Sequence, residues 1–196
     1  MGDKKQQTPL TINQKVVIWA QGKLGKRIGK GECWDLGEQA LKQAGAQTSN
    51  DLGPVDQDSD YIWGDSIDLK DAIAGDILQI RDHQVTTTTE TEYTFSDGSS
   101  EVVTESTTAQ RPHHTAILNG KLDANGAVGT LEQHVKPLGK VVQNKKIYTR
   151  DVPPVVKNTV AKRKNPTTKK LETAKVTKTV TIAVTGTIWA YRPKPK

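Results

Sequence analysis

The sequence predicts an α+β protein in which helices come first and an antiparallel sheet follows. Within the first 45 residues, apolar positions recur at intervals of three and four, the spacing of one helix face. From Ile77 onward the chain changes to short apolar or alternating runs separated by turn residues, which are typical of strands. A chain of 196 residues favours one domain, large enough to bury a core.

Two helices are expected before residue 46. Thr11 or Asn13 caps the first, and Gly25 ends it. Cys33, the only cysteine, opens the second, which Gly45 ends. The first N–H groups of a helix have no internal partner, so a thiol placed there ionises more readily to the nucleophilic thiolate. A lone cysteine is also often a small buried apolar residue, and its position alone leaves both interpretations open.

The strands begin with the apolar run at residues 77–80. In residues 84–110, Thr alternates with other side chains on both sides of Asp97-Gly98. An Asp-Gly pair between two such runs is the strongest local signal for a hairpin. We expect a long, exposed arm here, inserted into a single domain of residues 11–196 and leaning on a neighbouring segment. Further strands are expected around residues 114–118, 128–135, 138–149 and 176–191. The basic stretch 157–175 fits a loop or a second hairpin, and residues 1–10 are expected to be disordered.

The positive charge of the chain belongs to its tail. Residues 1–150 hold 17 Lys and Arg against 20 Asp and Glu, whereas residues 151–196 hold 11 against 2. Basic runs can bind phosphate backbones or anionic membranes, although most are solvated loops. No Phe or Tyr alternates with these lysines to stack on bases, which argues against nucleic-acid binding. Binding of an anionic polymer through this tail is one hypothesis for function, to be weighed beside the two that are given below.

The composition also excludes several classes of site. One cysteine rules out an intrachain disulfide, and no CxxC motif or Cys/His cluster indicates zinc. The acids Asp56, Asp58 and Asp60 lack the Gly and closing Glu of a calcium loop. We therefore expect no metal and no cofactor. No apolar run is long enough for a signal peptide or a membrane span, so we expect a cytoplasmic protein, with secretion as an open alternative.

The residues that a cysteine hydrolase needs lie on neighbouring predicted elements. A nucleophilic cysteine requires a base within hydrogen-bonding reach, and that base requires an orienting group. His114 directly precedes an apolar strand, and Glu132 and His134 are two apart in the next strand, on the same face. A cysteine at a helix N-terminus, with a histidine and a polar residue on adjacent strands, is the layout of papain-type enzymes.

Five motifs in this order resemble the CHAP and NlpC/P60 group of papain-like cysteine peptidases and amidases. Within that group the chain is similar to the cysteine-proteinase-fold domain known from a fungal myosin-tail-interacting protein and its bacterial relatives. The motifs are Gly31-Glu32-Cys33-Trp34-Asp35-Leu36, Tyr61-Ile62-Trp63-Gly64, Gly75-Asp76-Ile77-Leu78-Gln79-Ile80, His114-Thr115-Ala116-Ile117 and Leu131-Glu132-Gln133-His134-Val135, and the closing residues 187–193 also fit.

The resemblance implies a papain-like, NlpC/P60-type fold, with N-terminal helices packed on an antiparallel, partly barrel-like sheet. It implies that Cys33 is the nucleophile, His114 the general base and Glu132 the orienting group, with His134 beside it where the family usually has Asn. Trp34 and Trp63 are expected to contact substrate. The implied reaction is cleavage of an amide bond in a peptide or peptidoglycan-like substrate. The alternative is a non-catalytic module that keeps this fold to bind a protein partner.

Overall fold

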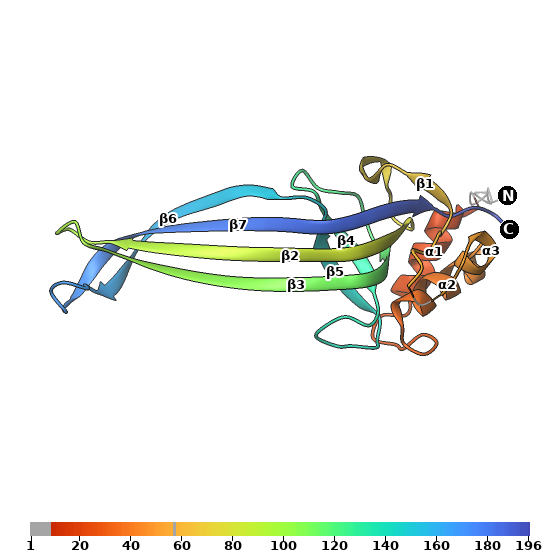
Figure 1. Ribbon diagram of the computed structural model, residues 1–196, viewed down its shortest axis with the longest axis horizontal. Helices are drawn as coiled ribbons and strands as arrows, with labels where there is room; N and C mark the ends of the chain where they lie inside the picture. Colours follow the sequence, from red (N-terminus) through yellow and green to blue (C-terminus); the bar gives the residue numbers. More distant parts are fainter. Residues whose placement is uncertain (1–8, 57) are drawn as a thin grey trace, which may run out of the picture. The chain divides into compact units, whose positions relative to one another are not determined.

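The computed structural model describes residues 9–56 and 58–196, and it is α+β with a mostly antiparallel sheet (Figure 1). The strand order is β1-β7-β2-β3-β4-β5, and β6 pairs with β7. The elements are α1 (Ile12–Gln21), α2 (Cys33–Ala44), α3 (Ser49–Leu52), β1 (Asp65–Ile67), the 3-10 helix η1 (Leu69–Asp71), β2 (Ile77–Thr94), β3 (Ser100–Leu118), β4 (Ala127–Glu132), β5 (Gln143–Tyr148), β6 (Val152–Lys164) and β7 (Leu171–Arg192).

The chain divides into two units. Unit 1 contains the chain up to His83 together with Arg111–Thr149 and Gly186–Lys196. Unit 2 contains Gln84–Gln110 and Arg150–Thr185. Unit 1 therefore holds all of the predicted site residues, and unit 2 holds the Thr-rich hairpin and the basic stretch.

Local signals explain the two long helices of unit 1, which pack against each other (Figure 1). Thr11 caps α1 by accepting a hydrogen bond from the Gln14 N–H, and the helix ends at Gly22 rather than at Gly25. Asn13, the other candidate cap, instead lies inside α1. The second helix begins at Cys33 as predicted, and Gly45 closes it in the left-handed conformation at φ 74°.

The sheet of unit 1 is buried on both faces, which explains its continuous apolar runs. Ile77, Ile117 and Leu131 face the helices, where they pack with side chains such as Leu36, Leu41 and Trp63. Their neighbours along the strands face a second core on the other side. This second core contains Leu78, Ile80, Ala116, Leu118, Val128, Ile147 and Ala190.

Unit 2 consists of two hairpins. The first is formed by β2 and β3, which turn at Asp97-Gly98 as the sequence predicted. The second, formed by β6 and β7, shows that the basic stretch 157–175 is a hairpin and not a loop. The first hairpin leans on the second, because Phe95 is buried and Asn165 donates a hydrogen bond to Asp97.

The remaining predictions concern the chain ends and membranes. Of the segment predicted to be disordered, residues 1–8 lie outside the described residues, and residues 9 and 10 are exposed without regular secondary structure. Among the helices in the described ranges, none has the length and apolar character needed to cross a membrane.

Candidate active site

Hydrogen bonds fix the loop that leads into Cys33. The Asp35 carboxylate, in the first turn of α2, accepts from the N–H groups of Lys30 at 2.9 Å and Glu32 at 3.0 Å. The buried Gln133 amide accepts from the Ile28 N–H at 2.8 Å and donates to the carbonyl oxygens of Ile28 and Glu32 at 3.0 and 2.8 Å. The residue after β4 thus holds the backbone immediately before the thiol.

A glycine lets α2 approach the sheet closely. A Cβ atom on Gly37 would lie 3.1 Å from the Trp63 ring and 3.2 Å from the Thr115 methyl group. Because these contacts are tight even for a methyl group, a larger residue would push α2 away from β3. Gly37 therefore helps to set the separation between Cys33 and the strand that carries His114.

The thiol lies where β3 and β4 separate. Their ladder contains the pairs Ile117↔Leu131 and Leu118↔Thr130. The Thr115 N–H and the Trp34 N–H at the start of α2 are close enough to the Cys33 sulfur to stabilise the thiolate. The His114 ring lies beside the same thiol and favours its ionised form. Burial would raise the pKa of Cys33, but the His114 ring and the two N–H donors outweigh it, so that the pKa is lowered.

Glu132, at the end of β4, lies on the other side of the His114 ring. His114 Nε2 is 3.1 Å from Glu132 Oε2, although its N–H is not aligned as a hydrogen bond. Burial disfavours the imidazolium, but the contacts with Cys33 and Glu132 raise the pKa of His114 to about 9. Burial likewise opposes the carboxylate, but His114 and Arg111 lower the pKa of Glu132 to about 2.

A buried arginine holds the carboxylate in place. Arg111 donates through Nε to Glu132 Oε2 at 2.8 Å and through Nη2 to Oε1 at 3.1 Å. Thr130, two residues earlier on β4, also donates to Oε1. Cys33, His114, Glu132 and Arg111 thus form a continuous row of ionisable groups drawn from α2, β3 and β4.

His134 does not join this row. Strand β4 ends at Glu132, and His134 has a positive φ of 66°, so the expected alternation of side chains stops before it. Its Nδ1 lies 2.6 Å from Glu32 Oε2, and its side chain is half exposed. Lys140 pairs with the same Glu32 carboxylate at 2.6 Å. The structure therefore places His134 beside the loop before Cys33 and away from Glu132.

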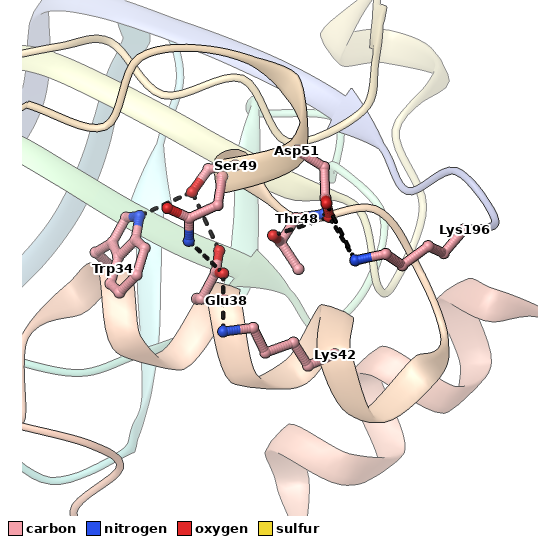
Figure 2. Close-up of polar contacts among 8 residues, drawn as sticks. Trp34, Glu38, Lys42, Thr48, Ser49, Asp51 and Lys196 are labelled. Carbon is pink, nitrogen blue, oxygen red and sulfur yellow. Dashed lines mark hydrogen bonds and ion pairs between the residues drawn. The ribbon is translucent and has the colours of Figure 1, made fainter.

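The two tryptophans expected to contact substrate have different surroundings. Trp63 is fully buried and donates to Gln79 Oε1 at 3.2 Å, so it serves the core, which corrects the expectation of substrate contact. Trp34 is partly exposed, and its indole N–H donates to Ser49 Oγ at 2.8 Å (Figure 2). Ser49 donates in turn to the buried Glu38 carboxylate at 3.1 Å, so that α3 fixes the ring next to Cys33 in the chain.

Sequence reasoning missed three residues of this site. Arg111 binds Glu132, 21 residues further along the chain, and Gln133 binds Ile28, 105 residues earlier. No local sequence pattern indicates contacts between such distant residues. Tyr61 is buried, and burial together with the nearby Cys33 charge raises its pKa. Tyr61 belongs to the Tyr61-Ile62-Trp63-Gly64 motif, and this was the sequence signal that could have identified it as a residue of the site.

Comparison with protein-family models, with curated proteins and with solved structures found no match to this chain. Within residues 9–56 and 58–196, no group of three or more His, Cys, Asp and Glu side chains is arranged to hold a metal ion.

Proposed function

We propose that this chain is a papain-like cysteine hydrolase that cleaves an amide bond by acyl transfer. The observation that carries the proposal is the contact between the Cys33 thiol and the His114 ring, with Glu132 on the far side of that ring. The lowered pKa of Cys33 and the raised pKa of His114 favour the thiolate–imidazolium pair at neutral pH.

The proposed reaction begins with attack of the Cys33 thiolate on the carbonyl carbon of the substrate. His114 Nε2 lies beside Glu132, so Nδ1 is the nitrogen that holds the thiol proton. When the tetrahedral intermediate collapses, the C–N bond breaks and His114 gives this proton to the leaving amine. His114 then takes a proton from water, which hydrolyses the thioester, and returns that proton to Cys33.

The substrate class in this proposal is a peptide or a peptidoglycan-like amide. The developing oxyanion needs hydrogen-bond donors. The Cys33 N–H at the start of α2 is the backbone candidate, and the Tyr61 hydroxyl, close enough to interact with the Cys33 charge, is the side-chain candidate. Trp34, held by Ser49, is the proposed substrate contact on the helix side.

The alternative is a protein-interaction module without catalysis, and one observation favours it. The Glu132 carboxylate accepts from two Arg111 nitrogens, Nε and Nη2, whereas the His114 N–H is poorly aligned with it. A buried network of this kind can serve structure alone.

Measurement of the rate of iodoacetamide alkylation of Cys33 against pH tests the proposal without a known substrate. The native protein should react well below the free-thiol pKa of about 8.5. His114→Ala should move the profile to or above that value, because burial of the thiol remains while the cation is lost. Glu132→Gln should give a smaller shift in the same direction.

His113→Gln is the matched control, because its ring lies on the same strand but contacts the Ser59 carbonyl oxygen. The proposal fails if His114→Ala leaves the profile unchanged, or if Cys33 reacts only when the protein unfolds. A low thiol pKa without hydrolysis of any peptide or peptidoglycan fragment, compared with Cys33→Ser, would favour the interaction module.

A further inference from the structure

The two hairpins of unit 2 carry opposite charges. Residues 84–110 contain five acidic residues and no basic one, whereas residues 150–185 contain nine basic residues and two acidic ones. The hairpins meet through Arg163, which donates to Glu101 through Nε at 2.9 Å and Nη2 at 2.8 Å. The Arg163 guanidinium also lies 4.2 Å from the centre of the Tyr93 ring. The acidic hairpin therefore neutralises only part of the basic one.

The register of β6 and β7 separates the basic hairpin into two faces. Residues directly opposite each other in an antiparallel pair share a face. Ala161↔Ala174 and Thr159↔Val176 lie on one face, where Ala174 and Val176 are buried. The other face, here called the lysine face, contains the pairs Lys164↔Leu171, Lys162↔Thr173, Val160↔Lys175, Asn158↔Thr177 and Val156↔Thr179.

The lysine face combines cations with exposed aliphatic side chains. It contains no acidic and no aromatic residue. Lys162, Lys164 and Lys175 form no ion pair with any residue of the described chain. Leu171 is 70% exposed and Val160 is 66% exposed, so both apolar side chains are free to contact a partner.

A preformed hollow lies at the tip of this hairpin. Its volume is about 520 Å³, and Lys162, Lys164, Lys169 and Leu171 are among the residues that line it. Glu101 also lines it, but Arg163 neutralises that carboxylate. The hollow therefore has an excess of positive charge beside an exposed leucine.

The turn that forms the hollow is held by a buried asparagine. Asn165 Oδ1 accepts from the N–H groups of Thr167 at 2.7 Å and Thr168 at 3.0 Å. Its Nδ2 donates to Asp97 and Glu172, both at 3.1 Å. These bonds order the turn before any partner binds, which lowers the entropy cost of binding.

We propose that the lysine face binds the surface of a membrane that contains anionic phospholipids. Lipid phosphates occupy the hollow and pair with Lys162 and Lys164, and Leu171 enters the interface between headgroups and acyl chains. Nucleic acid fits less well, because the face has no aromatic ring on which bases could stack. An acidic protein would pair with the lysines but would not account for the exposure of Leu171 and Val160.

Vesicle flotation with the full chain tests this inference. One set of vesicles contains phosphatidylcholine alone, and the other contains phosphatidylcholine mixed with phosphatidylglycerol. We expect binding to the mixed vesicles only, weakened by salt. The double variant Lys162→Gln/Lys164→Gln should weaken this binding roughly 25-fold, because each lysine near an anionic leaflet contributes a factor of roughly 5. Leu171→Ser should weaken it roughly tenfold.

Matched controls lie in the same unit. Lys157 and Lys178 oppose each other on the other face of the hairpin, so their double Gln variant removes the same charge. Val102→Ser removes an exposed apolar side chain, 53% accessible, from the acidic hairpin. Neither control should weaken binding more than roughly twofold.

Equal binding to both vesicle types, or equal losses in the Lys157/Lys178 control, overturns the inference. Tighter binding of heparin or duplex DNA than of vesicles, insensitive to Leu171→Ser, assigns the face to a polyanion and overturns it as well.

Discussion

The pair of Arg111 and Glu132 offers a test of how the site holds its charges. Arg111→Met removes the guanidinium but keeps an apolar stem of similar length. Both side chains are buried, at 6% and 0% exposure. After the substitution, Glu132 keeps Thr130 as a hydrogen-bond donor and His114 as its nearby cation.

The expected cost at pH 7 is large. Removal of one partner of a buried ion pair typically lowers the free energy of unfolding by about 3–5 kcal/mol. The pKa of Glu132 provides a second measure, since it lies at about 2 against an ordinary value of 4.5. At about 1.4 kcal/mol per pKa unit, this difference corresponds to about 3–4 kcal/mol of stability, which His114 and Arg111 supply together.

The sign of the pH dependence follows from the lowered pKa. This stability is fully present above pH 4.5 and is lost as the pH falls towards 2, because the unfolded chain takes up the proton first. His114 contributes to the lowering together with Arg111, so Arg111→Met raises the pKa of Glu132 only part of the way to 4.5. The variant should therefore lose less stability than the native protein over the same pH range.

Urea unfolding followed by tryptophan fluorescence reports on the unit concerned. All four tryptophans, at positions 19, 34, 63 and 189, belong to unit 1, and unit 2 contains none. Arg81→Met is the control, because Arg81 and Asp60 form a more exposed pair at 2.8 Å that should contribute less than about 1 kcal/mol. Adding Glu132→Gln to Arg111→Met should restore part of the loss, because the unpaired charge is then gone.

The reasoning is refuted if Arg111→Met costs no more than Arg81→Met at pH 7. It is also refuted if the dependence of stability between pH 2 and pH 4.5 is the same in the variant and in the native protein. In either case Arg111 would not be the group that holds the Glu132 carboxylate.

Three further predictions follow from particular contacts. Burial lowers the pKa of His83 from 6.5, so this residue destabilises the fold as the pH drops below 6.5, and His83→Gln should raise the free energy of unfolding at pH 5.5 relative to that at pH 7.5, compared with the native protein, in urea titrations. Gly37→Ala places a methyl group 3.1 Å from Trp63 and should cost about 1–3 kcal/mol in the same titration, whereas Gly120→Ala, which has open space around it, should cost almost nothing. Asn165→Ala removes one hydrogen-bond donor from each of the Asp97 and Glu172 carboxylates and should speed amide hydrogen exchange in both turns that Asn165 joins, without changing the fluorescence transition of unit 1.

Sequence reasoning succeeded where the determinants lie within a few residues of each other. The start of α2 follows from Asp35, which binds the N–H of Glu32 three residues earlier, and its end follows from Gly45. The first hairpin follows from Asp97-Gly98, where the Asp97 carboxylate binds the Ser99 N–H. Each signal acts within one turn of chain, so it can be recognised without the rest of the fold.

Sequence reasoning failed where a distant segment decides the position of a side chain. Period-2 alternation put His134 on the same face as Glu132, but the strand ends at Glu132 and His134 has a positive φ, so the alternation does not continue to it. Trp63 was expected at the surface of the site, yet Gly37 allows α2 to cover it. Both outcomes depend on packing between elements, which propensity and spacing do not encode.

The row of charges explains why Arg111 belongs to the site even though it does not touch the thiol. With Cys33 ionised and His114 protonated, Cys33, His114, Glu132 and Arg111 alternate in sign and sum to zero. When the proton returns to Cys33, the first two groups become neutral, and Glu132 and Arg111 still cancel each other. The proton can therefore move between sulfur and imidazole without leaving a net buried charge, which would be costly in either state.

Without Arg111, the same proton movement would start and end with one uncompensated negative charge. Glu132 would then hold the proton on His114 more strongly, and the ring would give it up less readily to a leaving amine. In the proposed reaction the buried arginine thus balances the carboxylate, so that His114 stays basic enough to ionise Cys33 and acidic enough to complete the cleavage.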